Sequence, residues 1–119
     1  MDSISDSCEK IKNFCEARDW DQFHDPKELS IGISTEANEL LDLFRFKKEV
    51  DMEKMLEDPV IRGRISHELA DIFFFLVRFS QRYQFDLIEA LNEKMAVNEQ
   101  KYPVEQARGS NKKYNELRD

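Results

Sequence analysis

The sequence predicts an all-α protein, built as a small bundle of four helices. Glycine and proline, which interrupt helices, each occur only three times among the 119 residues. The stretches between them are rich in Leu, Ile, Phe, Glu, Lys and Ala, and no segment alternates apolar and polar residues for long enough to predict a strand. A chain of this length has room for one domain, so residues 1–119 are expected to form a single one.

The first helix is predicted from Ser3 or Ser5 to Arg18. Its apolar residues recur at spacings of three and four, which places them on one helix face. Two of them are cysteines seven residues apart, or about 10 Å along a helix, which is too far for a disulfide and indicates packed, reduced thiols. Residues 19–24 form a connection. The apolar face consists of Ile4, Cys8, Ile11, Phe14 and Cys15.

Asp25-Pro26 predicts the start of a second helix, because aspartate is a preferred N-cap and proline fits the first helical position. This helix is expected to end near Phe46 or Lys47. Residues 48–58 are dense in charge, and we expect a mobile connector there with no more than one helical turn. The apolar stripe of the second helix consists of Leu29, Ile33, Ala37, Leu40, Leu41 and Phe44.

Asp58-Pro59 repeats the cap-then-proline signal and predicts a third helix that ends at about Arg82. Its middle, residues 72–77, is apolar on all sides, and a helix of this kind is buried on all sides. In so small a protein this predicts a subunit interface, and dimerisation is the usual supplement to a small core.

Asp86 is expected to cap a fourth helix that runs to Tyr102, where Pro103 stops it. Residues 104–119 then form a polar tail with several basic side chains. The tail is either a loose end or a basic flap that closes on an anion.

Two acidic motifs are the most informative feature of the chain: Glu36-Ala-Asn-Glu39 and Glu68-Leu-Ala-Asp71. Residues three apart lie on the same side of a helix, so each pair aims two carboxylates the same way, and antiparallel packing would bring all four together. Lys and Arg are missing from residues 31–43 and 68–77. Carboxylates packed in this way repel one another unless they lose charge or share a cation. Oxygen ligands suit Mg²⁺ or Mn²⁺, which often hold substrate phosphates, so the pairs predict a metal-dependent enzyme for a small phosphate ester or anhydride.

The net charge and the sequence motifs argue against several other classes of protein. The formal net charge of −7 opposes binding to a nucleic acid polymer or an anionic membrane. The longest apolar run is too short to span a membrane, and residues 1–19 lack the apolar region of a signal peptide, so we expect a cytoplasmic protein. A di-iron bundle needs Glu-x-x-His, but His67 directly precedes Glu68 and points about 100° away. The sequence has no glycine-rich phosphate loop.

At these acidic motifs the sequence resembles the MazG-like, all-α nucleoside triphosphate pyrophosphohydrolases, whose hallmark is ExxE, a spacer of variable length and ExxD. Within that family it is most similar to the dCTP pyrophosphatase-like branch. The resemblance covers most of the chain from about residue 11 onward. Its strongest segments are residues 18–24, 36–47, 68–71, 94–103 and 107–114.

The resemblance implies a homodimer or a dimer of dimers that cleaves a dNTP, with dCTP preferred, to dNMP and pyrophosphate. It implies that Mg²⁺, or Mn²⁺ in its place, is held by Glu36, Glu39, Glu68 and Asp71, with Glu36 or Glu39 activating the attacking water. Trp20 and Phe46 match aromatics around the base. The remaining residues of the expected substrate site are His24, Lys47, Phe75, Lys94, Asn98, Tyr102, Arg108 and Lys112.

Three departures from the family pattern leave alternatives open. Thr35 stands where many members have a second glutamate, Phe46 replaces a tryptophan of the branch, and Ile11 replaces a histidine. The last two bear on base preference, so a related pyrophosphohydrolase for dUTP or a phosphoribosyl-ATP is one alternative. The other is a noncatalytic helical interaction module in which the four carboxylates make salt bridges between chains.

Overall fold

The computed structural model describes residues 3–117, which contain helices, turns and loops and no β-strand. The all-α prediction is therefore confirmed. The chain divides into two compact units, one up to Gln84 and one from Phe85 onward. None of the described helices combines the length and the apolar character needed to cross a membrane.

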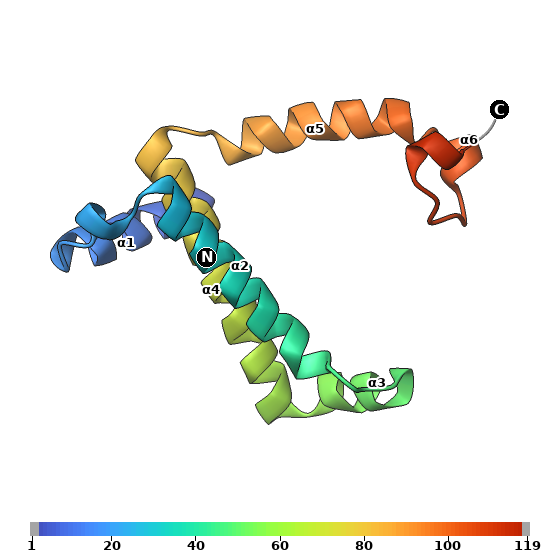
Figure 1. Ribbon diagram of the computed structural model, residues 1–119, viewed down its shortest axis with the longest axis horizontal. Helices are drawn as coiled ribbons and strands as arrows, with labels where there is room; N and C mark the ends of the chain where they lie inside the picture. Colours follow the sequence, from blue (N-terminus) through green and yellow to red (C-terminus); the bar gives the residue numbers. More distant parts are fainter. Residues whose placement is uncertain (1–2, 118–119) are drawn as a thin grey trace. The chain divides into compact units, whose positions relative to one another are not determined.

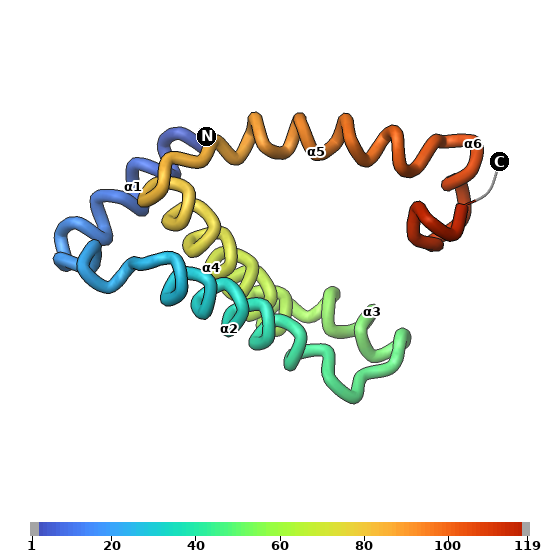
Figure 2. The backbone as a smooth tube through the Cα atoms, turned by 45° about the horizontal axis from the view of Figure 1, so that its top comes forward, coloured from blue at the N-terminus to red at the C-terminus, as the bar shows by residue number. Residues whose placement is uncertain are grey.

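The first unit contains four α-helices and one short 3₁₀ turn. Helices α2 and α4 run antiparallel and pack along each other, with α1 and α3 each packed against α4 (Figures 1 and 2). The long α2–α4 pair is the framework that positions the acidic motifs. The elements are α1 (Ile4–Ala17), η1 (Asp21–Phe23), α2 (Pro26–Phe44), α3 (Glu49–Glu57) and α4 (Pro59–Tyr83).

The predicted helix starts are confirmed by their caps. Ser3 and Asp6 form a reciprocal capping box at the start of α1. An Asp25 carboxylate oxygen accepts the Glu28 N–H at 2.7 Å, and Asp58 accepts the Val60 N–H at 2.9 Å. Such caps typically stabilise a helix by about 1 kcal/mol each, which explains why the cap-then-proline signal located α2 and α4 correctly.

Two expectations about residues 44–58 are wrong. Helix α2 ends at Phe44, because Arg45 is extended and Phe46 adopts a left-handed backbone with φ of 63°. The expected mobile connector is the nine-residue helix α3. Asp51 accepts the Lys48 N–H at 3.0 Å at its start, and the apolar spacing of this helix was hidden by charged residues around it. Met55 from that apolar face is buried.

The core of the first unit is small, and it leaves part of the apolar middle of α4 exposed, so burial of that segment by a subunit interface stays a prediction. Cys15 is fully buried and free, and burial raises its thiol pKa, as fits a packed, reduced cysteine. The middle of α4 is not buried on all sides in the single chain, because Phe73 and Leu76 are each 39% exposed. Leu41 on α2 is also exposed, so the acidic motifs lie on partly exposed helices. The buried apolar residues are Cys15, Leu29, Met55, Ile65 and Val77.

The second unit contains α5 (Leu87–Lys101), α6 (Val104–Ala107) and the 3₁₀ turn η2 (Tyr114–Glu116). Asp86 caps α5 by accepting the Glu89 N–H at 3.0 Å, as expected. Within residues 104–117 the tail forms α6 and η2. The Tyr114 ring lies edge-on to Tyr102, at 6.3 Å between centroids, and the Lys101 ammonium lies 4.6 Å from its centroid.

Candidate functional site

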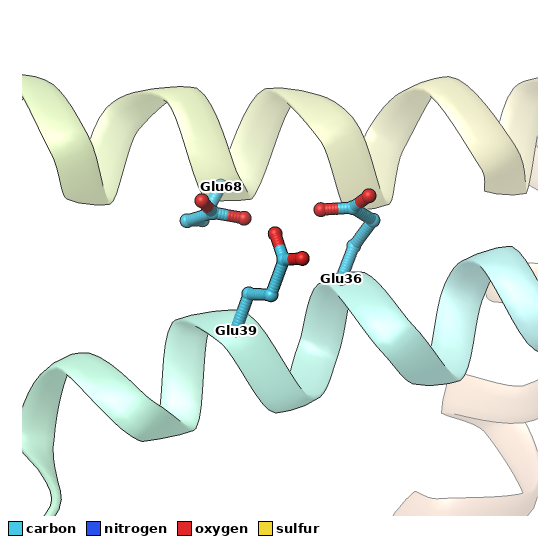
Figure 3. Close-up of side chains that lie close together, drawn as sticks. All are labelled: Glu36, Glu39 and Glu68. Atoms are coloured by element: carbon cyan, nitrogen blue, oxygen red, sulfur yellow. The ribbon is translucent and has the colours of Figure 1, made fainter.

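Three carboxylates converge between α2 and α4. Glu36 and Glu39 come from α2 and Glu68 from α4, and one oxygen of each lies within 4.8 Å of the others (Figure 3). The three-residue spacing turns both α2 glutamates toward α4, and the antiparallel pairing brings Glu68 opposite them. We call Glu36, Glu39 and Glu68 the carboxylate group.

Burial and mutual repulsion disfavour full ionisation of this group. Burial, followed by the close approach of Glu39, raises the pKa of Glu36 to about 7. Burial also raises the pKa of Glu68, and the Glu39 and Asp71 charges act in the same direction. Each of Glu36 and Glu68 has an Oε2 atom that is buried and finds no hydrogen-bond partner among the described residues. Such atoms are costly to bury without compensation.

A hard divalent cation fits these residues. The donors are three carboxylate oxygens with no nitrogen or sulfur among them, which is the chemistry that Mg²⁺ and Mn²⁺ prefer. The two unpartnered buried oxygens would gain a ligand contact, and the repulsion within the group would fall. Within residues 3–117 this is the one cluster of acidic, histidine or cysteine side chains with the spacing to hold a metal ion.

The fourth predicted carboxylate, Asp71, lies outside the carboxylate group. It is exposed on α4, about one turn beyond Glu68. Its negative charge nevertheless raises the pKa of both Glu36 and Glu68. Asp71 is therefore close enough to contribute to the field at the group without being one of its three converging donors.

An open hollow of about 610 Å³ adjoins Glu39. Glu39 thus belongs to both the carboxylate group and the wall of this hollow. Asn38, Asp42 and Arg45 in this wall were not among the expected site residues, and Thr35 was noted only as a departure from the family pattern. Thr35, Asn38 and Asp42 recur three or four residues apart on α2, and Arg45 directly follows the last residue of that helix, so helical spacing was their signal in the sequence. The lining residues are Thr35, Asn38, Glu39, Leu41, Asp42 and Arg45.

Trp20 and His24 lie in the connection between α1 and α2. Trp20 is 36% exposed, and its ring lies edge-on to Phe14 and to His24. His24 Nδ1 accepts a hydrogen bond from Arg78 Nε at 2.9 Å, and burial together with the Arg78 charge lowers the His24 pKa. His24 therefore anchors the connection to α4 as a neutral imidazole.

Arg78 is a residue that the sequence analysis missed. It is a charged side chain only 2% exposed on α4, and it pairs with Asp21 as well as His24. Its sequence signal was an arginine placed directly after six consecutive apolar residues, where a charge must find partners.

The remaining first-unit candidates differ in exposure. Phe46 is 89% exposed, with the Arg45 guanidinium 4.7 Å from its ring centroid, and Lys47 beside it is exposed too. Phe75 is half-buried instead. Its ring lies so close to Gly32 that a Cβ at that position would come within 2.6 Å of it. Phe75 therefore packs in the α2–α4 contact.

Five predicted substrate residues belong to the second unit, and whether they meet the carboxylate group stays a prediction. Lys94 and Asn98 are four residues apart on α5, and Tyr102 ends that helix. Arg108 follows α6, and the Lys112 N–H donates to the Ser110 hydroxyl at 3.3 Å in the loop beyond it.

Comparison with known proteins finds a family model, curated relatives and a solved structure that agree with one another. Residues 31–117 match the model of the MazG-like family. The chain is 38% identical over 104 residues to dCTP pyrophosphatase 1 of Mus musculus, and 36% identical to the Homo sapiens protein of the same name. Each match covers 87% of this chain and 61% of the relative, so the chain spans about three fifths of their length. A pyrophosphatase crystal structure from Archaeoglobus fulgidus aligns with a TM-score of 0.79 and 32% identity, covering 87% of this chain and 94% of that one.

Proposed function

The chain belongs to the MazG-like family, and from this premise we propose that it is a nucleoside triphosphate pyrophosphohydrolase of nucleotide-pool house-cleaning. It cleaves a dNTP, with dCTP preferred, to the dNMP and pyrophosphate. The observation that carries the proposal is the carboxylate group, with two buried oxygens that find no partner among the described residues. The names of the relatives, dCTP pyrophosphatase 1 and pyrophosphatase, support the choice of reaction.

Glu36, Glu39 and Glu68 would hold Mg²⁺, or Mn²⁺ in its place, with Asp71 adding negative charge from one turn away. When bound, the cation neutralises charge on the triphosphate and polarises the phosphorus under attack. An interaction module with interchain salt bridges is the weaker interpretation, because the carboxylate oxygens turn toward one another between α2 and α4 (Figure 3).

Glu39 is the better candidate for the base that orients and deprotonates the attacking water. It is exposed and lines the hollow, whereas Glu36 and Glu68 each bury an oxygen. A general base must reach the water whose proton it takes, so access from the hollow favours Glu39 over Glu36.

The aromatic residues Trp20 and Phe46 are proposed to contact the base, since both expose ring surface. The basic and polar residues of the second unit are proposed to contact sugar and phosphates, and the whole chain to act as one domain. We also propose a cytoplasmic homodimer or homotetramer. The exposed apolar residues Leu41, Leu69, Phe73 and Leu76 support an assembly that covers them. The proposed substrate contacts are Trp20, His24, Phe46, Lys47, Phe75, Lys94, Asn98, Tyr102, Arg108 and Lys112.

Incubation with each dNTP and NTP, with and without Mg²⁺, tests the reaction directly. We expect nucleoside monophosphate and pyrophosphate, resolved by chromatography, only when the metal is present. dCTP is expected to give the highest kcat/KM, and the ranking of the bases separates this substrate from dUTP. Diphosphate and orthophosphate as products would contradict the proposal, because the wrong anhydride bond would have been cleaved.

Stabilisation by Mg²⁺ is expected to increase from pH 5 to pH 8. The pKa of Glu36 in the folded protein is about 7 against an ordinary value of 4.5. Its protonation therefore favours the folded state fully below pH 4.5, and that contribution is lost as the pH rises through 7. A cation needs the ionised form, so below pH 7 its affinity should fall about tenfold per pH unit for one displaced proton.

Thermal melting in Mg²⁺ and in EDTA at each pH measures this effect as a difference in Tm. His24 also titrates, but its lowered pKa means that it favours folding above its ordinary pKa and loses that contribution as the pH falls. Because this contribution is the same with and without metal, it cancels in the difference. An Mg²⁺-induced shift that does not change with pH would contradict metal binding at Glu36.

A further inference from the structure

We propose that Arg78 is a positioning residue that holds the α1–α2 connection so that Trp20 presents its exposed ring surface to the nucleotide base. The proposal rests on the proposed function for the role of the base. The placement of Trp20 by Arg78 can be tested without any nucleotide.

Arg78 uses each of its guanidinium nitrogens. Nε donates to His24 Nδ1 at 2.9 Å, Nη1 donates to Gln81 Oε1 at 3.3 Å, and Nη2 donates to an Asp21 carboxylate oxygen. Its side chain is 3% exposed, against 42% for that of Asp21. A buried guanidinium is tolerated when its rigid fork of donors is satisfied, and two of these three partners lie in the connection.

The bond to Arg78 fixes the form of His24. Because Nδ1 accepts a hydrogen bond, it carries no proton, so the neutral ring has its hydrogen on Nε2. The His24 carbonyl oxygen accepts from the Tyr83 hydroxyl at 3.1 Å and from Arg82 Nε at 3.4 Å. Side chain and backbone of His24 are therefore both attached to the last turns of α4.

Trp20 lies in a connection that has local bonds of its own, among them Gln22 to Asp19, but it is joined to α4 through Asp21 and His24. Its N–H donates to the Cys15 carbonyl at 3.0 Å, and the only regular element that follows before α2 is the three-residue η1. The indole centroid lies 5.4 Å from Phe14 and 6.1 Å from His24, edge-on to both rings. Asp21, which Arg78 binds, is the next residue in the chain. Without the Arg78 fork, the Asp21 side chain would be left with the longer 3.8 Å pair to Arg82 Nη1, and the His24 ring against which Trp20 rests would lose its bond to α4.

The chain has a single tryptophan, so its fluorescence reports on Trp20 alone. The experiment compares the full chain with Arg78→Lys, which keeps the charge and loses the fork, and with Arg64→Lys, a matched change at an exposed arginine on the same helix. Without nucleotide, Arg78→Lys should increase acrylamide quenching of Trp20 and shift its emission to longer wavelength. With dCTP and Mg²⁺, KM should rise about tenfold, as for one lost hydrogen bond to a charged group, while kcat changes by less than about twofold. Arg64→Lys should leave all of these values unchanged.

Unchanged quenching in Arg78→Lys would overturn the proposal, and so would a fall in kcat with KM unchanged. If Arg78→Lys does not fold, Asp21→Asn decides, because it weakens the pair at a half-exposed side chain: raised quenching supports the proposal and wild-type quenching overturns it. If the wild-type chain turns over no nucleotide, the proposed function fails separately. Quenching then decides whether Arg78 positions Trp20, while the role of Trp20 toward the base is overturned.

Discussion

Replacing Glu36 with glutamine is expected to abolish turnover and at the same time to raise the Tm of the metal-free protein. The Glu36 carboxylate is disfavoured by burial and by Glu39, as its pKa of about 7 shows, and one of its oxygens is buried without a partner among the described residues. An amide of the same shape carries no charge and can donate to the neighbouring carboxylates. The same change removes a proposed Mg²⁺ ligand, and kcat should fall by at least about a hundredfold. Opposite effects on activity and stability are typical of a functional site that is costly to the fold.

Melting in EDTA and steady-state kinetics with dCTP measure the two effects in one set of preparations. Glu53→Gln is the control, because Glu53 is exposed on α3. A surface change of this kind should alter stability by less than about 0.5 kcal/mol and leave turnover intact. A Glu36→Gln protein that keeps wild-type kcat would refute its role as a ligand. A lower Tm in EDTA would show that the Glu36 carboxylate stabilises the fold.

Replacing Gly32 with alanine is expected to destabilise the protein by about 1–3 kcal/mol, the usual range for an overpacked contact. The new Cβ would lie 2.6 Å from Cδ1 and Cε1 of the Phe75 ring and 2.8 Å from its Cζ. Phe75 is half-buried in the α2–α4 contact, so the ring or the helices must shift. Gly32 lies four residues before Glu36 on α2, and the same two helices carry the carboxylate group. We therefore expect weaker stabilisation by Mg²⁺ as well.

Gly63→Ala is the matched control, because it is also a glycine-to-alanine change inside a helix. A Cβ at Gly63 meets no atom within 4 Å, so the gain in helix propensity should stabilise the protein by about 0.5–1 kcal/mol. Urea unfolding of both variants, with and without Mg²⁺, measures the contrast. Phe75→Leu added to Gly32→Ala should recover part of the loss. Equal stabilisation by both alanines would mean that the Phe75 ring moves away at no cost.

Local signals in the sequence determined the starts of the long helices. Asp25-Pro26 and Asp58-Pro59 located the starts of α2 and α4, because a cap and a proline act within one helical turn and need no distant partner. The same locality explains the failure at residues 48–58. Helix α3 is stabilised by burying Met55 and packing against α4, and a segment dense in charge gives little sign of such a contact.

The sequence by itself determined the all-α class, the family and the residue types of the candidate metal site. For the metal site the reason is local, because three-residue spacing on a helix fixes which side chains share a side. Only the tertiary structure decided which of these side chains meet. The antiparallel packing of α2 and α4 brings Glu68 to Glu36 and Glu39 and leaves Asp71 outside their group. It also buries Arg78 against His24 and Asp21, more than fifty residues away in the chain. Contacts at such separations depend on how whole helices pack, and a spacing pattern within one helix carries no information about that.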